Sequence, residues 1–296
     1  MNLNFTPGRL LRIALGEEQP LQVAGVINAY AAMMAERSGF RALYLSGAGV
    51  ANASFGLPDL GMTTLTEVLE DVRRITGATG LPLLVDADTG WGHGLMIRRS
   101  IREICRAGAA GVHIEDQVAA KRCGHRPGKA LVSTGEMVDR IKAAVDGRVD
   151  ADFVIMARTD AFAVEGLEAA VERACRYRDA GADMLFPEAL TELSLYRRFA
   201  DAAGLPVLAN MTEFGLTPMF GTDELAAAGV SLALYPLSAF RAMSAAALRV
   251  YRAIREEGSQ RSVVDIMQSR AELYDTLGYQ AFERKLDQLF GKEDTP

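Results

Sequence analysis

The stretch from Pro82 to Asp116, PLLVDADTGWGHGLMIRRSIREICRAGAAGVHIED, contains one complete repeat of the pattern that decides the fold. A short apolar run ends in Asp86-Ala-Asp88, a segment of helical period follows, and a second apolar run ends in His113-Ile-Glu-Asp116. Two parallel strands must be joined by a crossover, which is usually a helix. The stretch therefore predicts a strand–helix–strand unit.

The same alternation continues along the chain and predicts eight strands separated by helices. Such a parallel sheet closes as a single (β/α)8 TIM-type barrel, and an open doubly wound sheet is the alternative. No change in composition marks a second catalytic domain, so we assign the barrel to residues 1–240. The strands are expected at Gln22–Ala29, Ala42–Gly47, Pro82–Asp88, Gly111–Asp116, Phe153–Asp160, Met184–Glu188, Pro206–Thr212 and Leu232–Pro236.

Residues 241–296 exceed what one barrel helix requires. Ser238–Glu257 and Val263–Leu289 both have the period of long amphipathic helices. An apolar face needs a cover, which is either the chain's own barrel or a partner subunit. We expect a C-terminal helical extension that is exchanged between subunits.

The composition argues against several classes of protein. The 38 acidic and 32 basic residues give a net charge of −6, which disfavours nucleic-acid and membrane-surface partners. The longest nearly uncharged apolar stretch, Leu225–Leu237, is shorter than the roughly 20 residues that span a bilayer. Cys105, Cys123 and Cys175 are too few for a disulfide framework, and no export signal is evident, so we expect a cytoplasmic location.

Carboxylates follow two neighbouring strands at the end of the barrel where catalytic side chains lie. Asp86 and Asp88 share a face because they are two residues apart, and Glu115 ends the next strand. Three such acids repel one another unless a cation or protonation relieves them. Hard oxygen ligands suit Mg²⁺, or Mn²⁺, bound partly through water and substrate oxygens. The alternative is that Arg158 or loop cations balance these acids.

The segment Gln117–Ser133, QVAAKRCGHRPGKALVS, leaves the fourth strand at this same end. A loop of this length is usually either functional or disordered. A thiol flanked by cations has its thiolate favoured, so we expect Cys123 to be reactive. Zinc is a poor interpretation of Cys123 and His125, because no second ligand pair has suitable spacing. The cations of this segment are Lys121, Arg122, His125, Arg126 and Lys129.

Lys121-Arg-Cys-Gly-His125, preceded by Asp86-Ala-Asp88 and His113-Ile-Glu-Asp116, resembles the isocitrate lyase/phosphoenolpyruvate mutase superfamily. The resemblance covers essentially the whole chain and is fullest to the carbon–carbon lyases that cleave 2-methylisocitrate. Isocitrate lyases are longer and have Lys-Lys-Cys-Gly-His instead. Further similar runs are Phe186-Pro-Glu-Ala189, Asn210-Met-Thr-Glu213 and Tyr235-Pro-Leu-Ser-Ala-Phe-Arg241.

This resemblance implies a site, residue by residue. Asp86 and Asp88 would hold Mg²⁺, with Glu115 in its hydrated outer shell. Ser46, Gly47 and Ala48 would bind a substrate carboxylate, although the family commonly has Gly where this chain has Ala48. The methyl pocket would be Phe186, Leu234 and Pro236. The other residues of the tricarboxylate site would be Cys123, Gly124, Arg158, Glu188, Asn210, Met211, Thr212, Arg241 and Arg270.

The implied reaction is a magnesium-dependent retro-aldol-type cleavage of 2-methylisocitrate to pyruvate and succinate, as in the methylcitrate cycle of propionate catabolism. Cys123 would protonate the departing carbon, and Arg158 and His125 would stabilise its charge. Tyr44 or a carboxylate near the metal would accept the hydroxyl proton. The family is similar in forming homotetramers, which we expect here. The alternatives are isocitrate lyase, oxaloacetate decarboxylase or phosphonopyruvate chemistry, and a small-acid-binding barrel without catalysis.

Overall fold

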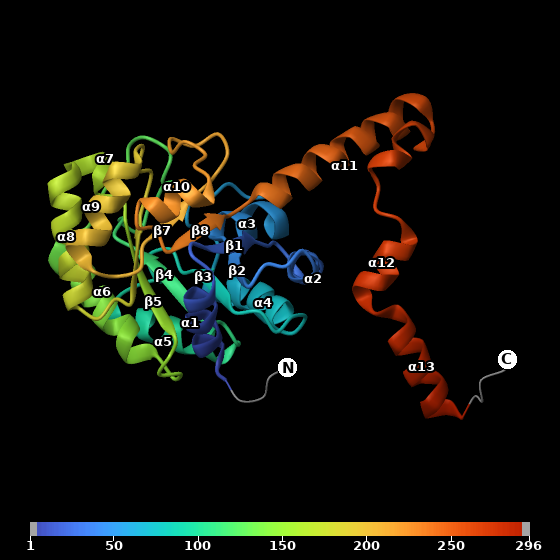
Figure 1. Cartoon of the computed structure of the whole chain (residues 1–296), viewed down its shortest axis with the longest axis horizontal. Coiled ribbons are helices and arrows are strands. Elements are labelled where there is room, and N and C mark those ends of the chain that lie inside the picture. Colours follow the sequence, from blue (N-terminus) through green and yellow to red (C-terminus); the bar gives the residue numbers. More distant parts are fainter. Residues whose placement is uncertain (1–4, 292–296) are drawn as a thin grey trace. The chain divides into compact units, whose positions relative to one another are not determined.

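The computed structural model describes residues 5–291, which divide into two compact units. The first unit ends at Ser238 and the second begins at Ala239. Figure 1 shows the helices of the first unit wrapped around its strands. Among the described residues, no helix combines the length and the apolar character that crossing a bilayer requires.

The first unit contains one parallel sheet with the order β6-β5-β4-β3-β2-β1-β8-β7. The sheet closes on itself, because Leu185 of β6 forms a parallel bridge with Val207, next to β7. The (β/α)8 barrel is therefore confirmed, and the open doubly wound alternative is excluded. The strands are β1 (Leu21–Gly25), β2 (Ala42–Leu45), β3 (Leu83–Asp86), β4 (Gly111–Glu115), β5 (Val154–Thr159), β6 (Met184–Pro187), β7 (Leu208–Asn210) and β8 (Leu232–Tyr235).

Local capping sets where several helices begin. Thr64 and Glu67 form a capping box at the start of α4, as the sequence suggests. Strand β1 ends earlier than predicted, because the Asn28 side chain accepts a hydrogen bond from Ala31 N–H and starts α2 there. The helical segments of this unit are α1 (Pro7–Glu17), α2 (Ala29–Arg37), α3 (Gly47–Gly49), η1 (Val50–Ser54), α4 (Leu65–Thr76), α5 (Gly94–Arg106), α6 (Thr134–Gly147), α7 (Phe162–Glu165), α8 (Leu167–Asp179), α9 (Leu193–Ala203) and α10 (Thr222–Ala227).

Alternate residues of each strand point to opposite sides of the barrel wall. On β2, Ala42 and Tyr44 belong to a buried cluster that fills the barrel interior. Leu43 and Leu45 belong to a second cluster, which also contains buried residues of the surrounding helices. This parity decides which side chains at the strand ends point into the barrel.

The second unit consists of helices. Helix α11 (Ser238–Glu257) has the predicted bounds, but the single predicted helix Val263–Leu289 is wrong. Ser269 caps a new helix, and Gly278 ends it with a left-handed φ of 66° that favours glycine. The segments after α11 are η2 (Arg261–Ile266), α12 (Arg270–Leu277) and α13 (Tyr279–Phe290).

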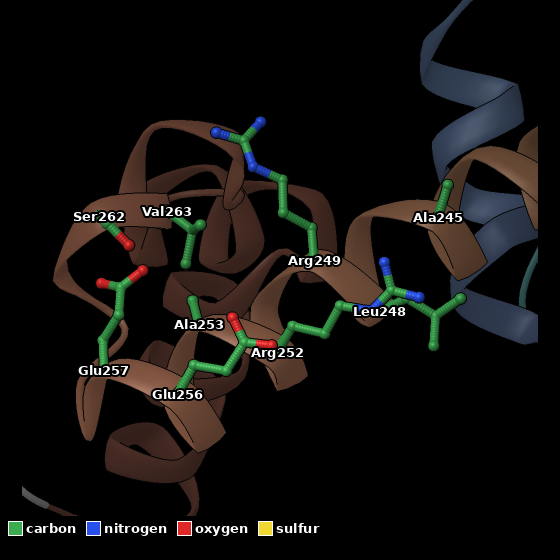
Figure 2. Close-up of a pocket in the computed structure, with 9 residues that line it drawn as sticks. All are labelled: Ala245, Leu248, Arg249, Arg252, Ala253, Glu256, Glu257, Ser262 and Val263. Carbon is green, nitrogen blue, oxygen red and sulfur yellow. The ribbon is translucent and has the colours of Figure 1, made fainter.

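Large apolar side chains are exposed along this second unit, including Phe282 and Phe290 of α13. Only Ala253 of α11 and Val263 of η2 are buried among its described residues. Both line a hollow of about 680 Å³ together with charged side chains such as Arg249 and Glu256, all of which are labelled in Figure 2. The unit by itself therefore has little core, and exchange between subunits stays a prediction.

Candidate active site

Polar side chains gather inside the barrel at the carboxyl ends of its strands. The strand register places Asp86 of β3 opposite His113 of β4, and Glu115 of β4 opposite Arg158 of β5. Asp86 and Arg158 have the parity of the interior residues of β3 and β5, and the alternate residues of β4, Val112 and Ile114, belong to the outer cluster, so all four side chains point into the barrel. The strand ends that the sequence marks as polar therefore meet in one place.

Arg158 lies at the centre of this group. Its Nη1 lies 3.3 Å from Glu115 Oε2, and its Nη2 lies 3.3 Å from Glu188 Oε2. Its Nε donates a hydrogen bond to Asp160 Oδ2 at 3.1 Å. Burial alone would lower the pKa of Arg158, but the three carboxylates hold it well above its ordinary value. The site therefore contains a permanent buried positive charge.

Asp86 and Asp88 differ in their electrostatic surroundings. Asp86 accepts hydrogen bonds from Gly47 N–H and Asp88 N–H, each at 3.0 Å. Burial would raise the pKa of Asp86, but His113, Lys121 and Arg158 bring it below its usual range. Burial and the charge of Asp86 raise the pKa of Asp88 to about 6, although Lys121 forms an ion pair with it.

Asp86 and Asp88 offer the oxygen donors that a hard divalent cation takes, but here Lys121 pairs with Asp88 and Arg158 with Glu115, which are the contacts that the alternative expects. A Cβ atom on Gly47 would lie 3.1 Å from Asp86 Oδ2 and 3.3 Å from Asp88 Oδ1, so both carboxylates border the space that this glycine leaves. Glu115 is fully buried, and neither of its oxygens has a hydrogen-bond partner among the described residues. Within residues 5–291, no three His, Cys, Asp or Glu side chains form a ready-made metal cluster. Mg²⁺ commonly takes one or two carboxylates and completes its shell with water and substrate oxygens.

Tyr44 and His113 form a buried pair beside Asp86. Tyr44 Oη lies 2.8 Å from His113 Nε2 and 3.4 Å from Asp86 Oδ2. Burial and the charge of Asp86 raise the pKa of Tyr44 well above its ordinary value, so its phenol keeps its proton near neutral pH. Burial lowers the pKa of His113 to about 4, so this imidazole is neutral there.

The segment Gln117–Ser133, which we call the Cys123 loop, contacts these strand ends. Lys121 lies 2.8 Å from Asp59 and also pairs with Asp88. A Cβ atom on Gly124 would lie only 2.5 Å from Arg158 Nη2, so the loop backbone packs directly on the arginine. The half-buried Cys123 is therefore held between two residues that contact the site.

His125 joins the loop to Glu188. Its Nδ1 accepts a hydrogen bond from Leu216 N–H at 3.0 Å and so carries no proton. Its Nε2 therefore holds the proton and lies 3.2 Å from Glu188 Oε1. Asn210 Nδ2 lies 3.4 Å from both oxygens of Glu188. Burial would raise the pKa of Glu188, but Arg158 and His125 lower it below its usual range.

The three residues assigned to a methyl pocket are buried at the ends of β6 and β8. Phe186 packs edge-on against His113 with ring centroids 5.2 Å apart. The Arg158 guanidinium carbon lies 5.3 Å from the centroid of the Phe186 ring. Leu234 belongs to the interior cluster with Phe186, and Pro236 is buried just after β8.

Other predicted site residues have more varied positions. Ser46 is buried at the start of α3, but Gly47 N–H already donates to Asp86. Met211 packs in the outer cluster, away from the barrel interior, while Thr212 is buried. The substrate contacts of these residues and of Ala48 stay predictions, as do those of two arginines in the second unit. These two are Arg241 on α11 and Arg270 at the start of α12.

Members of the site differ in how clearly the sequence marks them, and Asp59 carries no signal. The pairing of Asp59 with Lys121 joins two loops that are far apart in the chain. Lys121 is visible only as one cation of the Cys123 loop. Asp160 could have been found, because it stands two residues after Arg158 and therefore shares its face of the strand.

The comparisons with known proteins agree along nearly the whole chain. The family model described as phosphoenolpyruvate phosphomutase matches residues 11–255. The chain is 63% identical over 286 residues to a 2-methylisocitrate lyase of Salmonella typhimurium, which covers 96% of this chain and 97% of the relative. It is 62% identical over 288 residues to a 2-methylisocitrate lyase of Escherichia coli, covering 97% of both chains.

Solved structures show the same fold at lower identity. A crystal structure of 2,3-dimethylmalate lyase matches with a TM-score of 0.88 and 36% identity, covering 97% of this chain and 96% of the other. A phosphonopyruvate hydrolase in complex with oxalate and Mg²⁺ matches with a TM-score of 0.84 and 28% identity, covering 97% of this chain and all of the other.

The neutral state of His113 is testable by NMR on the metal-free protein. In the unfolded chain His113 has a pKa of 6.5 and binds a proton below that pH, whereas in the folded chain its pKa is about 4. His113 therefore contributes its stability above pH 6.5 and loses it as the pH falls towards 4. The chain has three histidines, and the imidazole carbon signal that disappears in His113→Asn belongs to His113. In the unmodified protein, the chemical shift of that signal should stay at the value of a neutral imidazole down to about pH 5. A midpoint near 6.5 for that signal would contradict this.

Proposed function

The chain belongs to the phosphoenolpyruvate phosphomutase family, and we propose that within this family it acts as a 2-methylisocitrate lyase. Such an enzyme is a carbon–carbon lyase that releases pyruvate and succinate. The high identity to relatives of that name supports this function over the decarboxylase and phosphonopyruvate alternatives. The observation that carries the proposal is the Cys123 loop, whose Gly124 packs on Arg158 at the carboxyl ends of the strands.

The substrate site follows from the distribution of charge. A tricarboxylate needs cationic partners, and Arg158 is a buried cation at the carboxyl ends of the strands, where it already contacts Glu115, Asp160 and Glu188. Ser46 and Ala48, at the start of α3, are proposed to bind one carboxylate through hydroxyl and backbone N–H. Arg241 and Arg270 are proposed to complete the site, as the family resemblance implies.

A divalent cation, Mg²⁺ or alternatively Mn²⁺, is proposed at Asp86 and Asp88, with Glu115 acting through water. The donor set is oxygen alone, which suits these ions. The magnesium in the structure of phosphonopyruvate hydrolase supports the choice. When bound, the cation would stabilise negative charge on the substrate hydroxyl oxygen and on the neighbouring carboxylate.

The protein's own residues then handle protons and charge. As the C2–C3 bond breaks, the electron pair stays on the carbon of the departing succinate, and Cys123 donates a proton to that carbon. Arg158 and the Nε2–H of His125 stabilise the negative charge that develops on the adjacent carboxylate. The raised pKa of Tyr44 favours a strand-end carboxylate as the acceptor of the hydroxyl proton, with the Tyr44 phenol as a hydrogen-bond donor.

The methyl group of the substrate is proposed to contact Phe186, Leu234 and Pro236. One methyl group in an apolar pocket discriminates by about 1–3 kcal/mol, or roughly 10- to 200-fold. Cleavage of isocitrate is therefore expected to be weaker but measurable.

Three features of the wider setting are proposed from the sequence and the family. The barrel domain is residues 1–240 and the oligomerisation segment is residues 241–296. The exposed apolar side chains of α13 support a homotetramer with exchanged tails, and sedimentation equilibrium of the full chain measures the subunit number. A cytoplasmic place in the methylcitrate cycle of propionate catabolism fits the proposed reaction.

The central assay follows pyruvate release from 2-methylisocitrate in the presence of Mg²⁺, with isocitrate and oxaloacetate as competing substrates. 2-Methylisocitrate should give the highest kcat/KM. Cys123→Ser should lower kcat by about 10²- to 10⁴-fold, because the general acid is lost. Cys105→Ser, on α5, is the matched control and should behave like the unmodified protein. Near-normal turnover by Cys123→Ser would remove this thiol from the chemistry, and a preference for oxaloacetate would refute the assigned substrate.

The metal site is tested by Asp86→Asn. The variant should need more than about tenfold higher Mg²⁺ for half-maximal activity, because a charged ligand becomes neutral. Asp139→Asn, at an exposed position on α6, serves as the control. Full activity of the unmodified protein in excess chelator would defeat the assignment.

A further inference from the structure

Asp160 is a fully buried carboxylate that contacts both Arg158 and the Cys123 loop. Its Oδ1 accepts a hydrogen bond from Lys129 Nζ at 2.8 Å. Its Oδ2 accepts one from Gln117 Nε2 at 3.3 Å and one from Arg158 Nε at 3.1 Å. Gln117 begins the loop and Lys129 lies near its end, so a single carboxylate holds both.

Gln117 and Lys129 in turn hold the backbone on the two sides of Cys123. The Gln117 side chain donates to Arg122 C=O and accepts from Arg122 N–H, both at 2.9 Å. The Lys129 ammonium, only 3% exposed, donates to Gly124 C=O. The residues immediately before and after the thiol are therefore each joined to Asp160 through one intervening side chain.

Asp160 is itself fixed from behind the strand. Its backbone N–H donates to Asp116 Oδ1 at 3.0 Å, and Thr159 Oγ1 donates to Asp116 Oδ2 at 2.7 Å. The Tyr177 hydroxyl of α8 also donates a hydrogen bond to Asp116 Oδ2, at 2.9 Å. Buried, charge-assisted hydrogen bonds of this kind are among the strongest in proteins.

We propose that Asp160 is a positioning residue that sets Cys123 and Arg158 in register with each other. Through Gln117 and Lys129 it places the thiol, and through its direct bond it orients the guanidinium. The inference rests on the proposed function, in which Cys123 donates the proton while Arg158 stabilises the charge on the same fragment. A misplacement of about 1 Å between such groups can lower a rate by about 100-fold.

The kinetic experiment compares Lys129→Met, Asp160→Asn and the double variant in the pyruvate-release assay. Lys129→Met should lower kcat about 10- to 100-fold with KM within about threefold, because Arg158 keeps its partner. Asp160→Asn should lower kcat and also raise KM, because Arg158 loses a carboxylate. The loss in the double variant should be clearly smaller than the product of the two single losses, since both changes remove the Lys129–Asp160 hydrogen bond. Lys142→Met, at an exposed position on α6, is the control.

A second readout does not depend on the reaction. Trypsin cleavage after the exposed Arg122 should be about tenfold faster in Lys129→Met and Asp160→Asn than in the control, because the loop is released. Lys129→Met with normal kcat, whatever its cleavage rate, would overturn the proposal, as would additive losses in the double variant. If the unmodified protein does not cleave 2-methylisocitrate, the proposed function fails. The link between Asp160 and the loop is then tested by trypsin alone. Equal rates of trypsin cleavage in Lys129→Met, Asp160→Asn and the control would overturn that link.

Discussion

The guanidinium of Arg158 allows this barrel to bury several carboxylates at the ends of its strands. Oxygens of Glu115, Asp160 and Glu188 lie 3.1–3.3 Å from it, and all three side chains are almost completely buried. An ionised carboxylate without a partner costs several kcal/mol to bury. Lys129 also pairs with Asp160 and His125 lies beside Glu188, while burial raises the pKa of Glu115 well above its ordinary value despite Arg158.

Two lysines, Lys121 and Lys129, pair with acids around Arg158. Lys121 reaches Asp88 and Asp59 on the side where a metal ion is proposed, while Lys129 reaches Asp160 on the other. Both lysines come from the Cys123 loop, so its seating on the strand ends depends on the acids beneath it. These ion pairs explain why an otherwise acidic chain has two of its lysines in this loop.

Much of this arrangement could be predicted from the sequence, because strand parity is a local property. The inward direction of Asp86 and Glu115 follows from the spacing of apolar residues in two strands, whereas Asp88 lies beyond the end of β3 with a left-handed φ of 45° that strand parity does not predict. The partner of Asp59 could not be predicted, since nothing local links it to Lys121. The sequence pattern does not predict the break at Gly278, where a left-handed φ of 66° ends α12.

Thermal unfolding of Arg158→Gln at two pH values shows whether the charge of Arg158 helps to balance the buried acids. At pH 8 the carboxylates that Arg158 contacts must either stay charged without this partner or take up protons from a dilute source. Both cost free energy of folding, so Tm should fall by at least about 5 °C. At pH 5.5 protonation is easier, so the loss should be clearly smaller. Arg73→Gln, an exposed position on α4, should change Tm little at either pH. A fall in Tm for Arg158→Gln no larger than that for Arg73→Gln, or one independent of pH, would show that Arg158 does not balance these acids.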